Sequence, residues 1–416
     1  MSEINPPALK PALPLPDPIC SDVPGTWAHS TTTVRMPATA RKTLVENDFS
    51  PQITACVQAL IDEIPQTPVR LLRQEAPDAA LWAGAVEPYL GQDWRKPPWF
   101  FVETYFYRRL LEATGYYEAG AGKGRDPFAY QKRVGLLATR PMINAVCERL
   151  AVWVEQGWQE RNLAALVAIN LWGNRADLSL WPADAGDDQP LQADWEAQEA
   201  QTLVDDTALV VRYLGQHQKG RVDFIVDNAG LELVTDLALA DYLLASGAAQ
   251  RVTLHLKMHP TFVSDAMIVD VQDTADFLAA EENEATAAFG HRLIAHLIAG
   301  RLQLRDHPFW TSPFPFWQLP DDLRQDLSQA QLIISKGDAN YRRLLGDRHW
   351  PFTTSFQEIM SYTPAPLLAL RALKAELAAG LSEEQIARLN VEDPDWLVNG
   401  RWGVIQFAEG KKTTNN

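Results

Sequence analysis

Asp227 and Asn228 stand side by side directly after the apolar run VDFIV (222–226) and before a helical pattern. A carboxylate beside an amide oxygen offers two hard oxygen ligands, the kind that Mg²⁺ or Mn²⁺ prefers. Gly230 permits a tight turn, and Glu232 adds a carboxylate to the first helical turn. Asp and Asn are also preferred residues for capping the N-terminus of a following helix. The pair by itself therefore leaves a metal site and a helix cap equally open.

A second polar group follows the next predicted strand, RVTLHLK (251–257). The stretch KMHPTFVSDAMIVD continues from it and contains Lys257, His259, Ser264 and Asp265. In open α/β sheets, ligands bind outside the carboxyl ends of the strands, so Asp265 is expected beside Asp227 and Asn228. Two carboxylates and an amide predict a single octahedral divalent ion that keeps water positions for a substrate phosphate.

A third group lies in IISKGDANYRRLLGD (333–347), where a strand runs into a glycine and then a helix. A glycine turn at a helix N-terminus is a ready anion site, and Lys336 adds positive charge for phosphate. Asp338 lies in the same turn, and Arg342 lies on the helix. A capped helix with solvated arginines is the alternative. The sequence has no GxxxxGK[ST] and no GxGxxG motif, so neither familiar nucleotide-binding fold is supported.

Two further stretches place polar or charged residues between apolar ones. Charges among apolar residues normally need partners. The two stretches are NLWGNRADLSL (170–180), with Asn174 and Asp177, and LALRALKAEL (368–377), with Arg371 and Lys374. For the second stretch a bound phosphate would serve as partner, and so would a salt bridge from the cations to Glu376 or another acid.

The pattern of elements changes near residue 201. Before it, apolar residues at helical spacing predict helices at 52–64, 102–114 and 131–157, with Pro141 as a breaker or a helix start. After it, the sequence predicts a helix over 202–214, strands at 222–226, 251–257 and 330–335, an amphipathic helix over 231–247, and a helix at 340–345.

Strands that alternate with helices in this way favour a mostly parallel sheet covered on both faces. We therefore predict an α/β protein with a Rossmann-like three-layer α/β/α part. Its expected organisation is a proline-rich tail (1–30), a mostly helical N-terminal part (31–200) and an α/β catalytic part (201–416). The acidic stretch 187–200 is predicted to be a linker or an exposed loop.

Composition narrows the class of protein. A formal net charge of −16 argues against a nucleic-acid-binding surface, and no run of apolar residues approaches a membrane span. The three cysteines show no CxxC spacing, which fits a reducing cytoplasm better than a disulfide framework. The proline-rich start has no basic region followed by an apolar run, so it does not read as a signal peptide.

An ordered series of motifs between about residues 99 and 376 resembles the metal-dependent damage-control phosphatase family. The motifs are WFFVETYFYRRLLEATG, DPFAYQK, LWGNRADLSL, DNAGLEL, KMHPTFVSDA and SKGDANYRRLLGDRHW. Within the family, the chain is similar to the branch of acidic-residue (protein-glutamate) methyltransferase-like proteins. The resemblance implies a phosphatase that hydrolyses small phosphorylated metabolites, such as fructose 1-phosphate or fructose 6-phosphate, with Mn²⁺, Co²⁺ or Ni²⁺, or with Mg²⁺.

The resemblance also implies roles for individual residues. It makes Asp227, Asn228 and Asp265 the metal ligands. It places substrate contacts at these three residues, at Asp338, Ala339, Asn340, Tyr341 and Arg342, and at Lys374. Glu232 matches the position assigned to S-adenosylmethionine in the methyltransferase description of the branch, and Glu103 lies in the first motif as a secondary candidate. One departure is Ala372, which stands where the branch signature Arg-Thr-x-Lys has threonine.

These residues predict a mechanism with open alternatives. Lys336, Arg342 and Lys374 are candidate cations for the phosphate oxygens. Asp338 or Asp227 is expected to orient the attacking water or accept its proton, and a covalent aspartyl-phosphate at Asp227 is a further option. The rival function is an S-adenosylmethionine-dependent protein-glutamate carboxyl methyltransferase, although no glycine-rich cofactor loop follows any predicted strand.

Overall fold

The computed structural model describes residues 10–73, 75–173, 200–217 and 219–410. Its centre is a seven-stranded sheet in the order β1-β7-β6-β5-β2-β3-β4. All neighbouring strands are parallel except β6 and β7. The strands are β1 (Thr202–Asp205), β2 (Gly220–Ile225), β3 (Ala249–Leu256), β4 (Leu302–Asp306), β5 (Leu332–Lys336), β6 (Leu367–Ala372) and β7 (Gly403–Ala408). The predicted α/β class with a mostly parallel sheet is confirmed.

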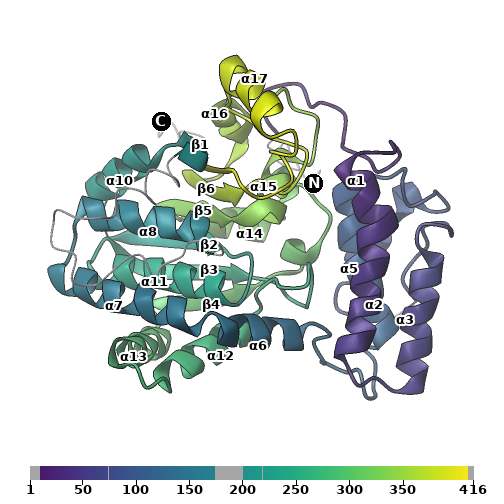
Figure 1. Cartoon of the computed structure of the whole chain (residues 1–416), viewed down its shortest axis with the longest axis horizontal. Helices are drawn as coiled ribbons and strands as arrows, with labels where there is room; N and C mark the ends of the chain where they lie inside the picture. The colour runs from purple at the N-terminus through teal and green to yellow at the C-terminus, as the bar shows by residue number, and fades with distance from the viewer. Residues whose placement is uncertain (1–9, 74, 174–199, 218, 411–416) are drawn as a thin grey trace, which may run out of the picture.

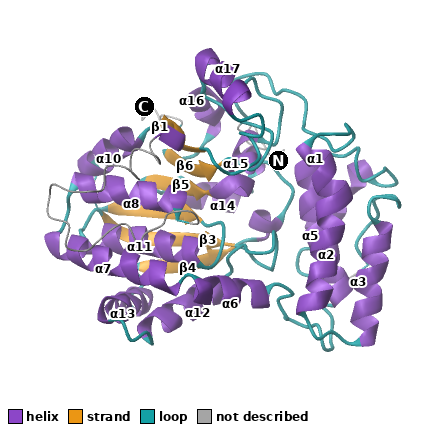
Figure 2. Ribbon diagram, viewed as in Figure 1, coloured by secondary structure: helices purple, strands orange, loops and turns teal. Residues whose placement is uncertain are grey.

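Helices cover both faces of this sheet (Figures 1 and 2). One face shares a hydrophobic core with α7 (Arg140–Gln156), α8 (Glu160–Trp172), α10 (Thr207–Gln216), α11 (Leu231–Ala245), α12 (Ile268–Ala279) and α13 (Glu284–Ile298). The other face packs on α14 (Asp321–Leu327), α15 (Gly337–Leu345), α16 (Phe356–Ile359) and α17 (Glu383–Glu392). Strands buried on both sides need apolar residues at consecutive positions, which explains continuous runs such as VDFIV. In β2, Phe224 enters the first core and Ile225 the second.

The N-terminal helices lie together beside the sheet rather than on its faces (Figure 1). They are α1 (Trp27–Ser30), α2 (Met36–Glu46), α3 (Pro51–Glu63), α4 (Ala79–Val86) and α5 (Trp99–Thr114), and α6 (Ala129–Ala138) leads from them to α7. A π-helical turn, Thr31–Arg35, joins α1 to α2. Helices α2 to α5 enclose a third core around Trp82 and Trp94, so this part of the chain buries its own apolar surface.

The structure confirms several predicted elements and corrects others. The predicted helices at 52–64 and 102–114 are α3 and α5, and Pro141 stands in the first turn of α7. The segment 202–214 is not one helix, because its first four residues form β1 against β7. Strands β4, β6 and β7 were not predicted.

Helix α11 is not amphipathic, because it is buried on every side between the sheet and the helices above it. Its polar residues look like a solvent-facing stripe in the sequence, but they have buried partners. Asp236 pairs with Lys336 at 2.9 Å, and Asp241 pairs with Arg292 at 2.8 Å.

Other sequence expectations concern the ends of the chain and its cysteines. Residues of the proline-rich start run over the surface, where Pro18 pairs with Arg348 and Cys20 with Pro98. The three cysteines are free. Among the described residues, no helix is long and apolar enough to cross a membrane. The predicted linker lies outside the described residues except at its last position.

Candidate metal and phosphate site

The turns after β2, β3, β5 and β6 border one cavity of about 580 Å³. Because β5, β2 and β3 are neighbours in the sheet, their carboxyl ends meet at the same edge. The N-terminal helices supply the opposite wall of the cavity. The predicted site residues that line it are Glu103, Asp227, Asn228, Glu232, Asp265, Lys336, Asp338, Ala339, Arg342 and Lys374.

Backbone hydrogen bonds tie the turn after β2 to the loop after β3. Asn228 pairs with Asp265 in an antiparallel bridge. The Ala266 N–H donates to the Asp227 carbonyl at 2.8 Å, and the Ala229 N–H donates to the Ser264 carbonyl at 2.7 Å. The structure thus brings together the three residues predicted to hold a metal ion.

Neither Asp227 nor Asn228 caps the helix that follows them. The N-cap position of α11 is Gly230, at φ 76°, and no side chain accepts a hydrogen bond there. The Asn228 amide instead donates to Asp227 Oδ2 at 2.8 Å and to Glu232 Oε2 at 2.9 Å. The helix-cap alternative is therefore wrong for this pair.

The carboxylates of Asp227, Asp265 and Glu232 carry an unbalanced negative charge. Asp227 Oδ1 is buried and has no hydrogen-bond partner among the described residues. Burial, and then the carboxylates of Asp265 and Glu232, raise the pKa of Asp227 well above its ordinary value. A divalent cation would give the orphaned oxygen a partner and offset the repulsion. Two carboxylates and an amide oxygen suit a hard ion, so the residues present fit the predicted metal.

Asp265 is held by one cation and by its own loop. Its carboxylate lies 3.0 Å from the Lys257 ammonium, which also donates to the Val226 carbonyl at 3.2 Å. Burial raises the pKa of Asp265 in spite of Lys257. The Ser264 hydroxyl donates to Asn228 Oδ1 at 2.6 Å and leaves the second lone pair of that oxygen for a ligand.

The loop that presents Asp265 has a strained backbone supported by the helical part. Phe262 and Val263 have φ values of 46° and 70°, which non-glycine residues rarely adopt. Such strain costs about 1–3 kcal/mol per residue and persists only where the surroundings impose it. Here the Phe262 ring packs against Phe100 and Tyr107 of α5, at centroid distances of 6.1 and 5.1 Å. Helix α5 therefore contributes to the position of Asp265.

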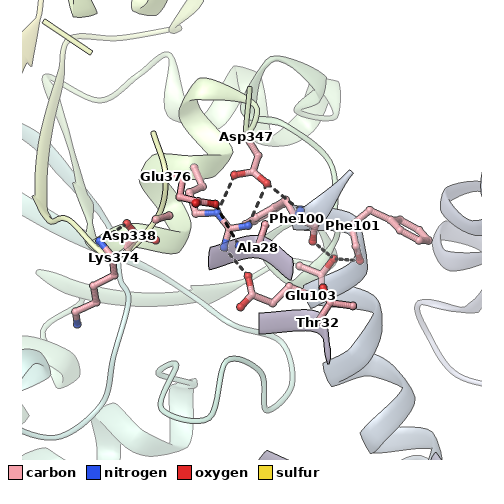
Figure 3. Close-up of polar contacts among 12 residues, drawn as sticks. Ala28, Thr32, Phe100, Phe101, Glu103, Asp338, Asp347, Lys374 and Glu376 are labelled. Carbon is pink, nitrogen blue, oxygen red and sulfur yellow. Dashed lines mark hydrogen bonds and ion pairs between the residues drawn. The ribbon is translucent and has the colours of Figure 1, made fainter. Parts of the chain in front are cut away.

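Asp338 faces the cavity from the start of α15 and is oriented by the strand beside it. Its Oδ1 accepts from Arg371 Nε at 2.8 Å and from the Lys374 backbone N–H at 3.1 Å. Arg371 is thus in a buried salt bridge with Asp338, and not with Glu376. The Lys374 side chain is exposed and points away from Asp338 (Figure 3). Within the described ranges, its ammonium has no hydrogen bond or ion pair, so it is available to a phosphate.

The other predicted cations already have protein partners. Lys336 lies 2.9 Å from Asp236 and donates to the Asn170 carbonyl at 2.8 Å. Arg342 binds both oxygens of Asp347 and also donates to Glu103. Both side chains line the cavity, but their charges are balanced locally.

The remaining predicted residues lie apart from the cavity or outside the structure described. Asn340 donates to the Lys336 carbonyl at 2.9 Å, and the Tyr341 hydroxyl donates to Gln406 at 2.7 Å, so neither side chain lines the cavity. Ala372, at the departure from the branch signature, does line it. The predicted residues Asn174 and Asp177 lie outside the described residues.

Comparison with known proteins identifies the family. A family model described as the damage-control phosphatase ARMT1-like domain matches residues 33–389. The chain belongs to this family. It is therefore a metal-dependent phosphatase, a phosphoric monoester hydrolase, as the ordered motifs predicted.

Two relatives agree with this assignment. Damage-control phosphatase ARMT1 of Danio rerio is 36% identical over 371 residues, which cover 82% of each chain. The Mus musculus protein of the same name is 36% identical over 333 residues, 76% of this chain and 75% of its own. A DUF89 family protein from Pyrococcus horikoshii has a TM-score of 0.44 and 14% identity over 90% of this chain and 96% of its own, which is too distant to add to the fold described above.

The phosphatase has a second carboxylate group that resembles a metal site by distance alone. Ligand atoms of Asp223, His255 and Asp326 lie within 4.8 Å of one another. Arg221 binds both oxygens of Asp223 and also Asp326, at 2.7–3.0 Å. Because arginine already balances these carboxylates, a metal ion has less to offset there than beside Asp227.

Some cavity residues of the phosphatase were not predicted. Trp27 and Arg35 come from α1 and the π-helical turn, and Tyr107 comes from α5. Tyr107 lies within a motif that carried the family resemblance, but nothing in that motif marks it as a ligand-binding residue. Trp27 and Arg35 precede the motifs, and only tertiary packing brings them to the cavity.

Proposed function

We propose that this phosphatase hydrolyses sugar phosphates such as fructose 1-phosphate or fructose 6-phosphate, in a damage-control role, with a divalent ion on Asp227, Asn228 and Asp265. The observation that carries the proposal is the buried, unpartnered Asp227 Oδ1 beside Asp265 at the wall of a cavity large enough for a hexose phosphate. Mn²⁺, Co²⁺ and Ni²⁺ are the proposed ions, with Mg²⁺ as a further candidate.

Each chain residue then has a defined task. Asp227, Asn228 and Asp265 would hold the ion, which supplies Lewis acidity and charge neutralisation for a phosphoryl oxygen when bound. Lys374 binds another phosphate oxygen, because its ammonium lines the cavity without a protein partner among the described residues. Asp338 lines the cavity and keeps one carboxylate oxygen on Arg371, which leaves the other to orient the attacking water and accept its proton.

Structural features also argue for supporting roles. Lys336 lies between Glu232 and Asp236 and offsets their negative charge. Arg342 and Glu103 form an ion pair in the wall of the cavity, and Arg342 also pairs with Asp347. Figure 3 shows the carboxylates of Glu103 and Asp347 facing each other. The covalent route through Asp227 is the competing mechanism, and acid quenching followed by peptide mass measurement would reveal an aspartyl-phosphate.

The methyltransferase alternative has less support. Glu232, its marker residue, is engaged with Asn228 at 2.9 Å and faces Lys336 at 3.6 Å. The family model and both relatives cited above carry phosphatase names. We also propose a cytoplasmic location, because the three cysteines are free.

A metal-supplemented assay tests the proposed function. Metal-free protein is incubated with fructose 1-phosphate or fructose 6-phosphate and with each of the four ions, and released phosphate is measured. We expect turnover only with a divalent ion. Turnover without metal, or no release from either ester with any ion, would refute the proposal. Transfer of a labelled methyl group from S-adenosylmethionine to protein carboxylates would favour the alternative.

A further inference from the structure

The N-terminal helices form the cavity wall opposite the acidic turn, which is the turn that carries Asp227, Asn228 and Glu232. This wall is fixed to the active-site edge of the sheet. Glu376, just beyond β6, accepts hydrogen bonds from the backbone N–H groups of Trp27 and Ala28 at 2.9 and 3.2 Å. Figure 3 shows Glu376 close to Ala28, with Lys374 on the same segment. A carboxylate at a helix N-terminus is a favourable cap, so the start of α1 has a defined position relative to Lys374.

Arg35, at the end of the π-helical turn that follows α1, belongs to this wall. Its guanidinium lies over the Trp27 ring, 4.6 Å from the centroid, and the side chain lines the cavity. Across the described part of the chain, Arg35 has no hydrogen bond to a carboxylate and no ion pair. Arg342, which also lines the cavity, is instead neutralised by Glu103 and Asp347. Arg35 is thus a cation of the cavity whose hydrogen-bonding capacity is open.

Glu103 and Tyr107 connect Arg35 with the acidic turn. Both lie on α5 and line the cavity. Burial raises the pKa of Tyr107 above its ordinary value, with further increases from Glu103 and Asp265 and an opposing effect of Arg35. Tyr107 lines the cavity about one helical turn from Glu103 on α5 and carries a neutral phenol. Its hydroxyl makes no hydrogen bond to any residue in the described ranges, and Glu103 binds Arg342 through Oε2 alone.

We propose that Arg35, Glu103 and Tyr107 form a binding site for the hydroxylated leaving group of the substrate, and so set its specificity. This inference rests on the proposed function, because it assigns the part of the substrate that is not the transferred phosphate. One guanidinium, one carboxylate and one phenol offer both donors and acceptors. A polyhydroxylated carbon chain matches that mixture. A second phosphate matches it poorly, because it would meet the carboxylates of Glu103 and Asp338.

The test compares two esters that share the phosphate and differ in the leaving group. Values of kcat/KM are measured with saturating Mn²⁺ on fructose 1-phosphate and on p-nitrophenyl phosphate, which has no aliphatic hydroxyls. We expect Arg35→Gln to lower kcat/KM on fructose 1-phosphate roughly 10- to 100-fold more than on p-nitrophenyl phosphate, because a charge-assisted hydrogen bond is lost with only one of them. Tyr107→Phe keeps the ring and should shift the same ratio by about 3- to 10-fold.

Arg41→Gln is the matched control. Arg41 is an exposed arginine of α2 that does not line this cavity, so both values should stay at the wild-type level. Equal losses on both esters in Arg35→Gln and Tyr107→Phe would overturn the inference while sugar phosphate hydrolysis by the wild type still stood. Failure of the wild type to hydrolyse any sugar phosphate would overturn the proposed function, and the inference with it. A larger loss on fructose 1,6-bisphosphate than on fructose 1-phosphate would contradict a neutral leaving-group site.

Discussion

The sheet carries two buried carboxylate clusters on the same pair of strands, and they differ in how their charge is balanced. Asp227, Asn228 and Asp265 lie beyond the carboxyl ends of β2 and β3. Asp223 and His255 lie within the same strands, where His255 pairs with Ile225, two residues beyond Asp223, and its Nε2 lies 3.0 Å from Asp223 Oδ2. The inner cluster has arginine partners at 2.7–3.0 Å, whereas the outer cluster leaves a carboxylate oxygen without any hydrogen-bond partner among the described residues.

Ligand spacing alone would select a different cluster from the one proposed to hold the ion. The inner group satisfies a distance test for three ligands, yet its charges are paired and Asp223 is fully buried. The outer group does not meet that distance test, but it borders a cavity and has a negative charge to offset. A bound metal ion is expected where the folded protein has both an unpaired charge and a cavity that gives access to it. A buried charge without a partner is costly.

The largest expected effect comes from removing a ligand of the outer cluster. Asp227→Asn keeps the shape of the side chain but loses the charge that holds the ion. Phosphatase activity should fall at least about 10³-fold, since metal Lewis acidity contributes several kcal/mol to such reactions. Mn²⁺ should raise the melting temperature of the wild type and have no effect on the variant. Retained activity, or a wild-type-like shift with Mn²⁺, would remove Asp227 from the metal site.

The inner cluster should show the opposite behaviour. Asp223→Asn leaves Arg221 and His255 without their buried carboxylate, which is expected to cost about 3–5 kcal/mol of unfolding free energy. Activity of the folded fraction should stay within about threefold of the wild type, and Mn²⁺ should still stabilise it. Denaturant unfolding and phosphate release measure the two quantities separately. A variant that is stable but inactive would show that Asp223 serves the reaction.

A smaller effect is expected from a substitution at Gly337, whose lack of a side chain leaves space for the Asp227 carboxylate. Its φ is 80°, and a Cβ there would lie 1.9 Å from Asp227 Oδ2. Gly337→Ala should therefore displace the carboxylate and lower activity about 100-fold.

Gly247→Ala separates strain from displacement. Gly247 has a similar φ of 75° with no atom within 4 Å of the added Cβ. Both variants should lose about 1–2 kcal/mol of stability from the left-handed backbone, but only Gly337→Ala should lose activity. Equal activity in the two variants would show that the close approach of Gly337 to Asp227 has no role in the site.

The sequence predicted the outer cluster better than its surroundings. Strand ends are visible as apolar runs followed by polar residues, so Asp227 and Asp265 were predictable together from the rule that ligands gather at the carboxyl edge. The partners of Lys336 and Arg342 were not predictable, because Asp236 lies inside a buried helix that read as amphipathic and Glu103 is far away in the chain. The same limitation hid β4, β6 and β7, whose sequences contain charged or small residues that only the neighbouring strands and helices accommodate.

The cavity wall formed by the N-terminal helices shows what local sequence pattern could not predict. Arg35 lies in a π-helical turn, and its place depends on Glu376, which caps α1 from a segment near the other end of the chain. No periodicity of residues 27–35 encodes that contact. Helix α5, in contrast, was predicted from spacing, but its role in supporting the strained turn at Phe262 and Val263 required the structure.

The smallest expected effect is a pH dependence to which Asp227 of the outer cluster contributes. The pKa of Asp227 is raised in the folded state, so the folded protein binds more protons than the unfolded chain above about pH 4, the ordinary range of an aspartate. The stability of metal-free protein should therefore fall as pH rises through that window towards the raised pKa. A bound divalent ion takes the place of the proton and should flatten the fall. Asp227→Asn should make the fall shallower without metal, whereas Asp223→Asn should retain the wild-type slope. Melting temperatures measured from pH 4 to 8, with and without Mn²⁺, give both slopes, and identical slopes in all three proteins would show that the outer cluster carries no excess negative charge.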